Sequence, residues 1–156
     1  MRHLLKFYRY IFGWENYLLL VRTIRAARLV RQHLPERAVS PHFASALKAV
    51  DQIYMSPQPD WKISDEEKIV RFAAFVIGFP FEWGKCVQQS LIVYRLLNGY
   101  GIPARICFGV SREANASDGH AWIIKLNDPE RPFAEESDPR ERFTLVYTSP
   151  QPAAIS

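Results

Sequence analysis

The chain has 156 residues, of which 48% are hydrophobic and 23% are charged, which is ordinary for one globular domain large enough to bury a core. Its two cysteines, Cys86 and Cys107, are too few for a disulfide framework and lack the spacing of metal ligands. We therefore expect a reducing, cytoplasmic setting and no metal site.

The charge is unevenly distributed: residues 1–37 contain eight Arg or Lys and two Glu, while the whole chain carries a net +4. Such a basic arm is either a solvated helix face or a surface for an anionic partner: nucleic acid, acidic lipid or an acidic protein. Because no nucleic-acid motif accompanies it, we expect no nucleic-acid partner. The apolar run at 17–21 is too short to span a bilayer and has no signal-peptide cleavage site, which leaves peripheral contact as the one membrane role open.

Two helices are predicted before residue 55. The first covers 14–33, where apolar residues recur at helical spacing and arginines cover much of the other side. The second covers 43–54. We expect residues 1–55 to form a basic helical region in front of a domain at 56–156, with the two packed as one compact unit. The apolar face expected for the first helix consists of Trp14, Tyr17, Leu18, Val21 and Ile24.

Two further helices follow. One starts at a capping box in which Ser64 is the N-cap and Glu67 lies three residues on. The other runs from about Cys86 to Asn98, and we expect Gly99 to be its C-terminal cap.

Beyond residue 103 the hydrophobic pattern changes from helical to alternating, which predicts strands. The predicted strands cover 105–110, 120–126 and 143–147, separated by polar loops at 111–119 and 127–141. Helices followed by an antiparallel meander make an α+β fold, in which the helix of Cys86 packs against the sheet.

Cys86 is the first residue whose position suggests chemistry. A thiol at a helix start tends to ionise, because unpaired backbone N–H groups and the helix dipole favour negative charge there. Lys85 adds positive charge and Gly84 permits close backbone approach. The alternative is a buried structural thiol, which is the common state of a lone cysteine. Cys107 lies in the middle of a predicted strand, so we expect it to be a packed interior thiol.

His120 opens a predicted strand after a polar loop that ends in Gly119. A histidine beside Cys86 can take the thiol proton and later protonate a leaving amine, which are the first two roles of a cysteine-hydrolase triad. The alternative is a histidine that only caps the strand. Trp122 points the same way as His120 and either forms a wall of the site or fills the core.

A third residue must hold the imidazole of His120 in one tautomer. The acidic candidates that follow the histidine strand are Asp128, Glu130, Glu135, Glu136 and Asp138. Asp128 falls in the turn at the far end of that strand, whereas Glu135 and Glu136 fit a returning strand beside His120, and we favour Glu135. An oxyanion hole would use the Cys86 backbone N–H and one more donor, for which Trp83, Gln88 and Gln89 are candidates.

With these segments identified, the chain resembles the lasso-peptide leader peptidases, a bacterial family of the transglutaminase-like cysteine hydrolases. The basic N-terminal helix ending in Leu34-Pro35 is similar to the opening segment of that family. The other matching segments are Trp83-Gly84-Lys85-Cys86-Val87-Gln88-Gln89-Ser90-Leu91, Tyr94-Arg95-Leu96-Leu97-Asn98-Gly99-Tyr100-Gly101-Ile102-Pro103-Ala104, Phe108-Gly109-Val110 and Gly119-His120-Ala121-Trp122. Their order and spacing together are specific, although each alone is weak.

The resemblance implies a transglutaminase- or papain-like core with Cys86 as nucleophile and His120 as base and acid. It implies a ribosomally made precursor whose leader is removed, a leader-recognition protein that delivers it, a separate ATP-dependent lasso cyclase, and no cofactor for the cleavage. The family usually has an aspartate after a short turn beyond the histidine strand. Here the best-aligned residues are Glu135 and Glu136, with Asp128 and Asp138 as alternatives.

Two other functions fit the same residues. An acyltransferase of the transglutaminase kind would use the same thioester and pass it to an amine. A non-catalytic binding module would keep the fold and use the basic helix for a partner, with an unreactive Cys86.

Overall fold

A computed structural model gives the structure of the protein over residues 14–33, 65–78, 85–113 and 119–149. Its helices are α2 (Trp14–His33), α4 (Glu67–Gly78) and α5 (Lys85–Gly99). Its strands are β1 (Ala104–Ser111), β2 (Gly119–Lys125), β3 (Asp128–Phe133) and β4 (Phe143–Thr148), with a short 3-10 helix η1 (Pro139–Glu141) before β4. The predicted helix at 43–54 and the predicted boundary at residue 55 lie outside these residues.

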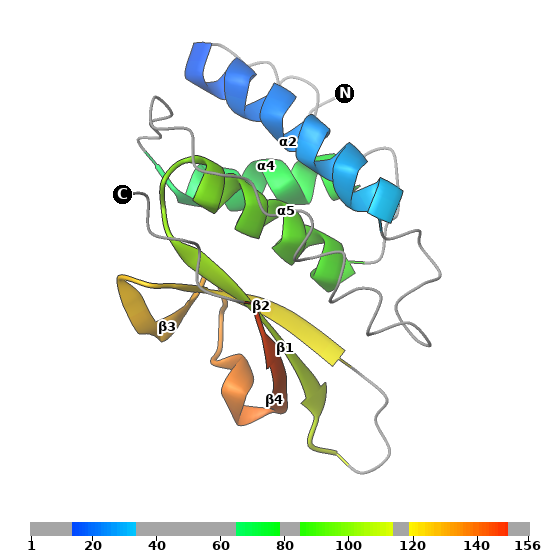
Figure 1. The fold of residues 1–156 in the computed structure, drawn as a ribbon, viewed down its shortest axis with the longest axis vertical. Helices are drawn as coiled ribbons and strands as arrows, with labels where there is room; N and C mark the ends of the chain where they lie inside the picture. Colours follow the sequence, from blue (N-terminus) through cyan, green and yellow to red (C-terminus); the bar gives the residue numbers. More distant parts are fainter. Residues whose placement is uncertain (1–13, 34–64, 79–84, 114–118, 150–156) are drawn as a thin grey trace.

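The three helices gather on one side of the sheet, and α5 lies between the other two helices and strands β1 and β2 (Figure 1). This central position explains why nearly every residue from Gln88 to Tyr100 is buried. The α+β class and the packing of the cysteine helix on the sheet are confirmed. Within the described residues, no helix is both long enough and apolar enough to cross a membrane.

The sheet is antiparallel with the strand order β3-β2-β1-β4. Only β1, β2 and β3 form a meander, because β4 pairs with the far side of β1. The predicted loop at 127–141 was therefore wrong in part, since it contains β3 and η1. Pro129 and Pro132 argue against a strand at this place in the sequence. The structure accommodates them because β3 is an edge strand, whose outer side forms no hydrogen bonds to another strand.

Helix α2 has the predicted bounds but buries nearly the opposite face. Trp14 is 74% exposed, and Tyr17 also faces solvent. Apolar residues occur on both sides of this helix, and the structure selects the side with small residues, which let α2 approach α4 and α5 closely. The buried face consists of Leu19, Thr23, Ala26, Ala27 and Val30.

The ends of α4 and α5 differ from the prediction by one or two residues. At the start of α4 the side chain of Asp65 accepts a hydrogen bond from the Glu67 N–H at 3.0 Å, which is the role predicted for Ser64, a residue outside the described ranges. At the end of α5 the left-handed residue is Gly101, with φ +74°, and not Gly99. The Ile102 N–H bonds back to the Leu97 carbonyl across it, which is a Schellman cap.

Candidate active site

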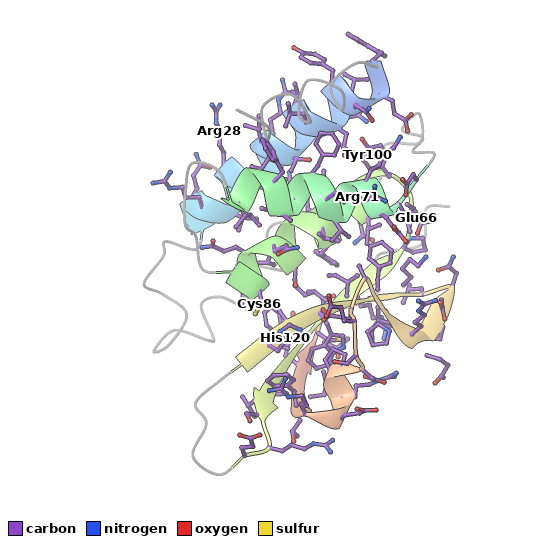
Figure 2. All side chains as sticks on the ribbon, turned by 180° about the vertical axis from the view of Figure 1, so that it is seen from behind. Arg28, Glu66, Arg71, Cys86, Tyr100 and His120 are labelled. Carbon is purple, nitrogen blue, oxygen red and sulfur yellow. The ribbon has the colours of Figure 1, made fainter. Side chains whose placement is uncertain are left out.

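Cys86 is the second residue of α5, and its side chain is partly exposed at the end of the helix that meets β2. Figure 2 shows its sulfur directly beside the labelled His120 on β2. The N–H groups of a first helical turn have no partner inside the helix, so a negative charge at this thiol lies at the positive end of α5. Cys86 therefore lies at a helix start, as the sequence predicts.

The first turns of α5 lie along one edge of β2. Strand β3 pairs with β2 only from Ile123 to Lys125, so it does not cover this edge between Gly119 and Trp122. Here Cys86 Sγ lies 3.9 Å from the Gly119 carbonyl oxygen. The Ser90 hydroxyl, one helical turn further on, donates to the Ala121 carbonyl at 2.8 Å. The first turns of α5 thus supply the contacts along the part of this edge that β3 leaves uncovered.

The imidazole of His120 connects the thiol to a carboxylate. It forms a side-chain hydrogen bond with Cys86. Its Nε2 lies 3.3 Å from both carboxylate oxygens of Glu135. Because Nε2 faces Glu135, Nδ1 is the nitrogen available to the thiol. Cys86, His120 and Glu135 therefore form one line of contacts.

Two aromatic rings fix the plane of the His120 ring. Trp122 stacks on it with ring centroids 6.2 Å apart, and Phe143 of β4 stacks on it at 5.2 Å. Gly109, opposite His120 in the β1–β2 register, leaves room for this arrangement. A Cβ there would lie 2.9 Å from Phe143 Cβ and 3.0 Å from Trp122 Cη2. Trp122 is 1% exposed, so it fills the core and also forms the surface on which the His120 ring stacks.

These contacts shift two pKa values in opposite directions. Burial raises the pKa of the Cys86 thiol, but hydrogen bonds from His120 and the Ala121 backbone N–H, with the charge of His120, outweigh it and hold the pKa below 9.0. Hydrogen bonds to Cys86 and then to Glu135 raise the pKa of His120 from 6.5 to about 9, although burial opposes this. Both directions favour a thiolate beside an imidazolium. By contrast, burial raises the pKa of Cys107.

Glu135 reaches His120 because the chain turns sharply after β3. The preceding residue, Ala134, has φ +59°, in the left-handed region that a residue other than glycine rarely adopts. The other acidic candidates lie elsewhere. Asp128 pairs with Lys125 at the far end of the hairpin, about 17 Å along the strand from His120 at about 3.3 Å per residue.

The remaining acids have other surroundings. Asp138 caps η1 and pairs with Arg140 at 2.6 Å. Glu136 is exposed, and the Glu130 backbone carbonyl accepts a hydrogen bond from Arg140. The structure therefore brings Glu135 to the histidine, as the sequence argument favoured.

A cleft of about 200 Å³ opens beside the three residues. Gln89 contributes to its lining, whereas Gln88 is 3% exposed and is not among the lining residues. Trp83, the other oxyanion candidate, lies outside the described residues. The larger apolar side chains of the lining are Val70, Val93, Ile123 and Phe133.

Sequence reasoning did not identify four residues that shape this site. Ser90 joins the nucleophile helix to the histidine strand, and Phe143 stacks on the imidazole. Gly109 makes room for that stack, and Ala134 turns Glu135 inward. The sequence weakly indicated Ser90, because it lies one helical turn after Cys86 and therefore on the same face of the helix. The roles of the other three residues depend on how the strands pair, which the sequence does not show.

Among the described residues, no group of three or more His, Cys, Asp or Glu side chains is arranged to hold a metal ion. A protein-family model described as the transglutaminase-like superfamily matches residues 18–148. This superfamily includes cysteine peptidases and acyltransferases. Neither a curated protein nor a solved structure matches the chain.

Proposed function

Because this chain belongs to the transglutaminase-like superfamily, whose members are generally cysteine-dependent enzymes, we propose that it is a cysteine peptidase that removes the leader from a lasso-peptide precursor. The observation that carries the catalytic part is the contact of His120 with both Cys86 and Glu135. The leader-peptidase part is supported by the order and spacing of the segments around Cys86, Gly101, Gly109 and His120.

In the proposed reaction the Cys86 thiolate attacks the carbonyl carbon of the scissile peptide bond, and the carbonyl electron pair moves onto oxygen. The resulting oxyanion is stabilised by backbone N–H groups of the first turn of α5, including that of Cys86. The imidazolium of His120 then gives its proton to the amide nitrogen. The C–N bond breaks, the core peptide leaves with a free amine, and the leader remains as a thioester on Cys86.

Hydrolysis of the thioester repeats these steps with water. Neutral His120 takes a proton from water, the oxygen attacks the thioester carbonyl, and the C–S bond breaks to restore the thiolate and the imidazolium. Glu135 stays ionised throughout, and it orients the imidazole and stabilises its charged form. The leader leaves as a carboxylate.

The proposed partners follow from the same resemblance. A leader-recognition protein delivers the precursor leader, and the released core passes to the ATP-dependent lasso cyclase, all in the cytoplasm. The basic N-terminal region, with exposed Arg25 and Arg28 on α2, offers charge for docking one of these partners or the leader.

A transglutaminase-like acyltransferase is the second candidate, because the superfamily contains both activities. The two share every step up to the thioester and differ only in the acceptor, which is water for the peptidase and an amine for the transferase. Product masses separate them, since hydrolysis adds one water to the leader and transfer adds the amine.

The test incubates the full chain with a candidate precursor peptide and a candidate leader-recognition protein, and products are read by mass spectrometry. We expect cleavage by the wild type and by Cys107→Ala, the matched control at the second cysteine. We expect no cleavage by Cys86→Ala. If Cys86→Ala still cuts, the mechanism is wrong. If Cys86 is unreactive and neither product forms, the binding module is the better description.

A further inference from the structure

We propose that Ser90 is a positioning residue for the Cys86–His120 pair, because its hydroxyl holds the strand that carries His120 against the helix that carries Cys86. This inference rests on the proposed catalytic pair. It concerns a residue outside the hydrogen-bonded line of Cys86, His120 and Glu135, whose effect is on the distance between two elements.

Ser90 is largely buried and also lines the cleft beside Cys86 and His120. Ser90 is 8% exposed, and its Oγ donates to the Ala121 carbonyl oxygen at 2.8 Å. Ser90 follows Cys86 by four residues, so both side chains lie on the same face of α5. Ala121 follows His120 directly in β2. One hydrogen bond therefore joins α5, one turn after Cys86, to the residue that follows His120 in β2.

The Ala121 backbone is held at two points by α5. Its N–H donates to the Cys86 sulfur, and its C=O accepts from Ser90. In an antiparallel strand these two groups of one residue point to the same side, and here they point away from β1. Strand β3 pairs with β2 only from Ile123 onward, so α5 supplies the partners that a strand would otherwise supply.

Thr23 shows what a buried hydroxyl does when it has only a local role. Thr23 is completely buried, and its Oγ1 donates to the Leu19 carbonyl of its own helix at 2.7 Å. That bond joins no second element. Ser90 instead bridges residues 31 apart in the chain. Loss of the Ser90 hydroxyl leaves the Ala121 carbonyl buried without this donor, and the helix and strand lose a link between them beside the catalytic pair.

A small separation matters at this site. The thiolate and imidazolium stabilise each other through a hydrogen bond, which weakens steeply with distance and angle. A shift of about 1 Å in a catalytic arrangement can cost about 100-fold in rate. The Ser90 hydroxyl therefore affects the reactivity of Cys86 as well as the stability of the fold.

The test compares Ser90→Ala with the wild type, and Thr23→Val is the matched control because it also removes one buried hydroxyl. The probe is iodoacetamide, with alkylation of Cys86 and Cys107 read separately by peptide mass from about pH 5 to about pH 10. The His120 ring is titrated by NMR in the same proteins. Urea unfolding shows that each variant is folded.

We expect Ser90→Ala to slow Cys86 alkylation at neutral pH by about 10-fold or more. We also expect it to move the His120 titration midpoint from about 9 towards 6.5. Ser90→Thr keeps a donor and should recover most of both properties. Thr23→Val should change neither. If Ser90→Ala is too unstable to study, Ser90→Thr and Ser90→Val repeat the comparison, because Thr and Val have the same shape and differ in the hydroxyl.

Unchanged alkylation and His120 profiles in folded Ser90→Ala or Ser90→Val would overturn the proposal. Equal losses in Thr23→Val would also overturn it, since the effect would then be general destabilisation. If wild-type Cys86 reacts as an ordinary thiol, both the catalytic pair and the role of Ser90 are wrong. If the profiles shift as expected but no precursor is cleaved, the role of Ser90 stands and the proposed peptidase function fails.

Discussion

Both carboxylate oxygens of Glu135 lie 3.3 Å from Nε2 of His120. The carboxylate thus faces this ring nitrogen with its two oxygens placed symmetrically, which leaves the other nitrogen available for the hydrogen bond with Cys86. This relationship holds the imidazole in one orientation and stabilises its positive charge. A glutamate therefore occupies the third position in the line of contacts that begins at Cys86.

Replacing Glu135 tests whether this carboxylate, and not a neighbouring acid, supports His120. We expect Glu135→Gln to lower the rate of leader cleavage by about 100-fold, because an uncharged amide stabilises the imidazolium poorly. Glu136→Gln changes an exposed neighbour in the same way and should leave the rate within about twofold, since surface changes away from the site have small effects. Equal rates for the two variants would remove Glu135 from the proposed triad.

The reactivity of Cys86 should depend on pH in two steps. The lowered pKa of Cys86 predicts that its alkylation becomes fast below pH 9.0, the ordinary value for a thiol. The raised pKa of His120 predicts a second change near pH 9, where the imidazolium loses its proton and the thiolate loses its charged partner. The measurement is the alkylation rate of Cys86 against pH, with Cys107, whose pKa is raised by burial, as the internal control. His120→Ala should show one step, moved up in pH.

Removing the thiol should change the titration of the histidine. The hydrogen bond with Cys86 is the largest cause of the raised pKa of His120. In Cys86→Ala we therefore expect the His120 midpoint, followed by NMR, to fall from about 9 towards 6.5, with the Glu135 contact keeping it above that value. A midpoint that stays near 9 in this variant would mean that the thiol does not stabilise the imidazolium.

Ala134 offers a test of backbone strain at the turn before Glu135. Its φ of +59° is one that glycine adopts without cost and a β-branched residue resists. We expect Ala134→Gly to raise the free energy of unfolding by up to about 1 kcal/mol. Ala134→Val should lower it by about 1–2 kcal/mol and also slow Cys86 alkylation, because Glu135 is displaced. Urea unfolding of the three proteins gives the order, and a reversed order would contradict the left-handed turn.

A side chain at Gly109 should destabilise the fold. A Cβ at Gly109 would lie 2.9 Å from Phe143 Cβ and 3.0 Å from the Thr144 carbonyl oxygen, so β4 or the aromatic rings must move. We expect Gly109→Ala to cost about 1–3 kcal/mol of stability, as overpacking usually does. It should also reduce the near-ultraviolet circular dichroism of the packed aromatic rings. Val110→Ala, at the exposed neighbouring residue, is the control and should change stability by less than about 1 kcal/mol.

Local patterns were enough to predict much of the fold. The helical spacing in α2 and α5 and the alternation in β1 gave their bounds to within one or two residues. These properties depend on residues close together in the chain, so a sequence window contains the information. The choice of the buried face of α2 was wrong, because the periodicity marks apolar residues without showing which side meets another helix.

The sequence was less informative about the edge position of β3 and about where α5 ends. The prolines of β3 argue against a strand when they are read locally, although they are harmless on the outer side of the sheet. Likewise Gly99 and Gly101 are both plausible caps in the sequence. Only the path of the chain into β1 places the left-handed conformation at Gly101.

By itself, the sequence determined the positions of the two reactive groups: Cys86 at the start of a helix and His120 at the start of a strand. The tertiary structure decided which acid contacts His120 and which contacts hold the helix of Cys86 against the strand of His120. Glu135 reaches His120 through the β2–β3 register and the turn at Ala134, and Ser90 reaches Ala121 because β3 leaves an edge of β2 uncovered. These contacts join residues 15 and 31 positions apart, and such distances are fixed by strand pairing and packing, which no local pattern of residue types encodes.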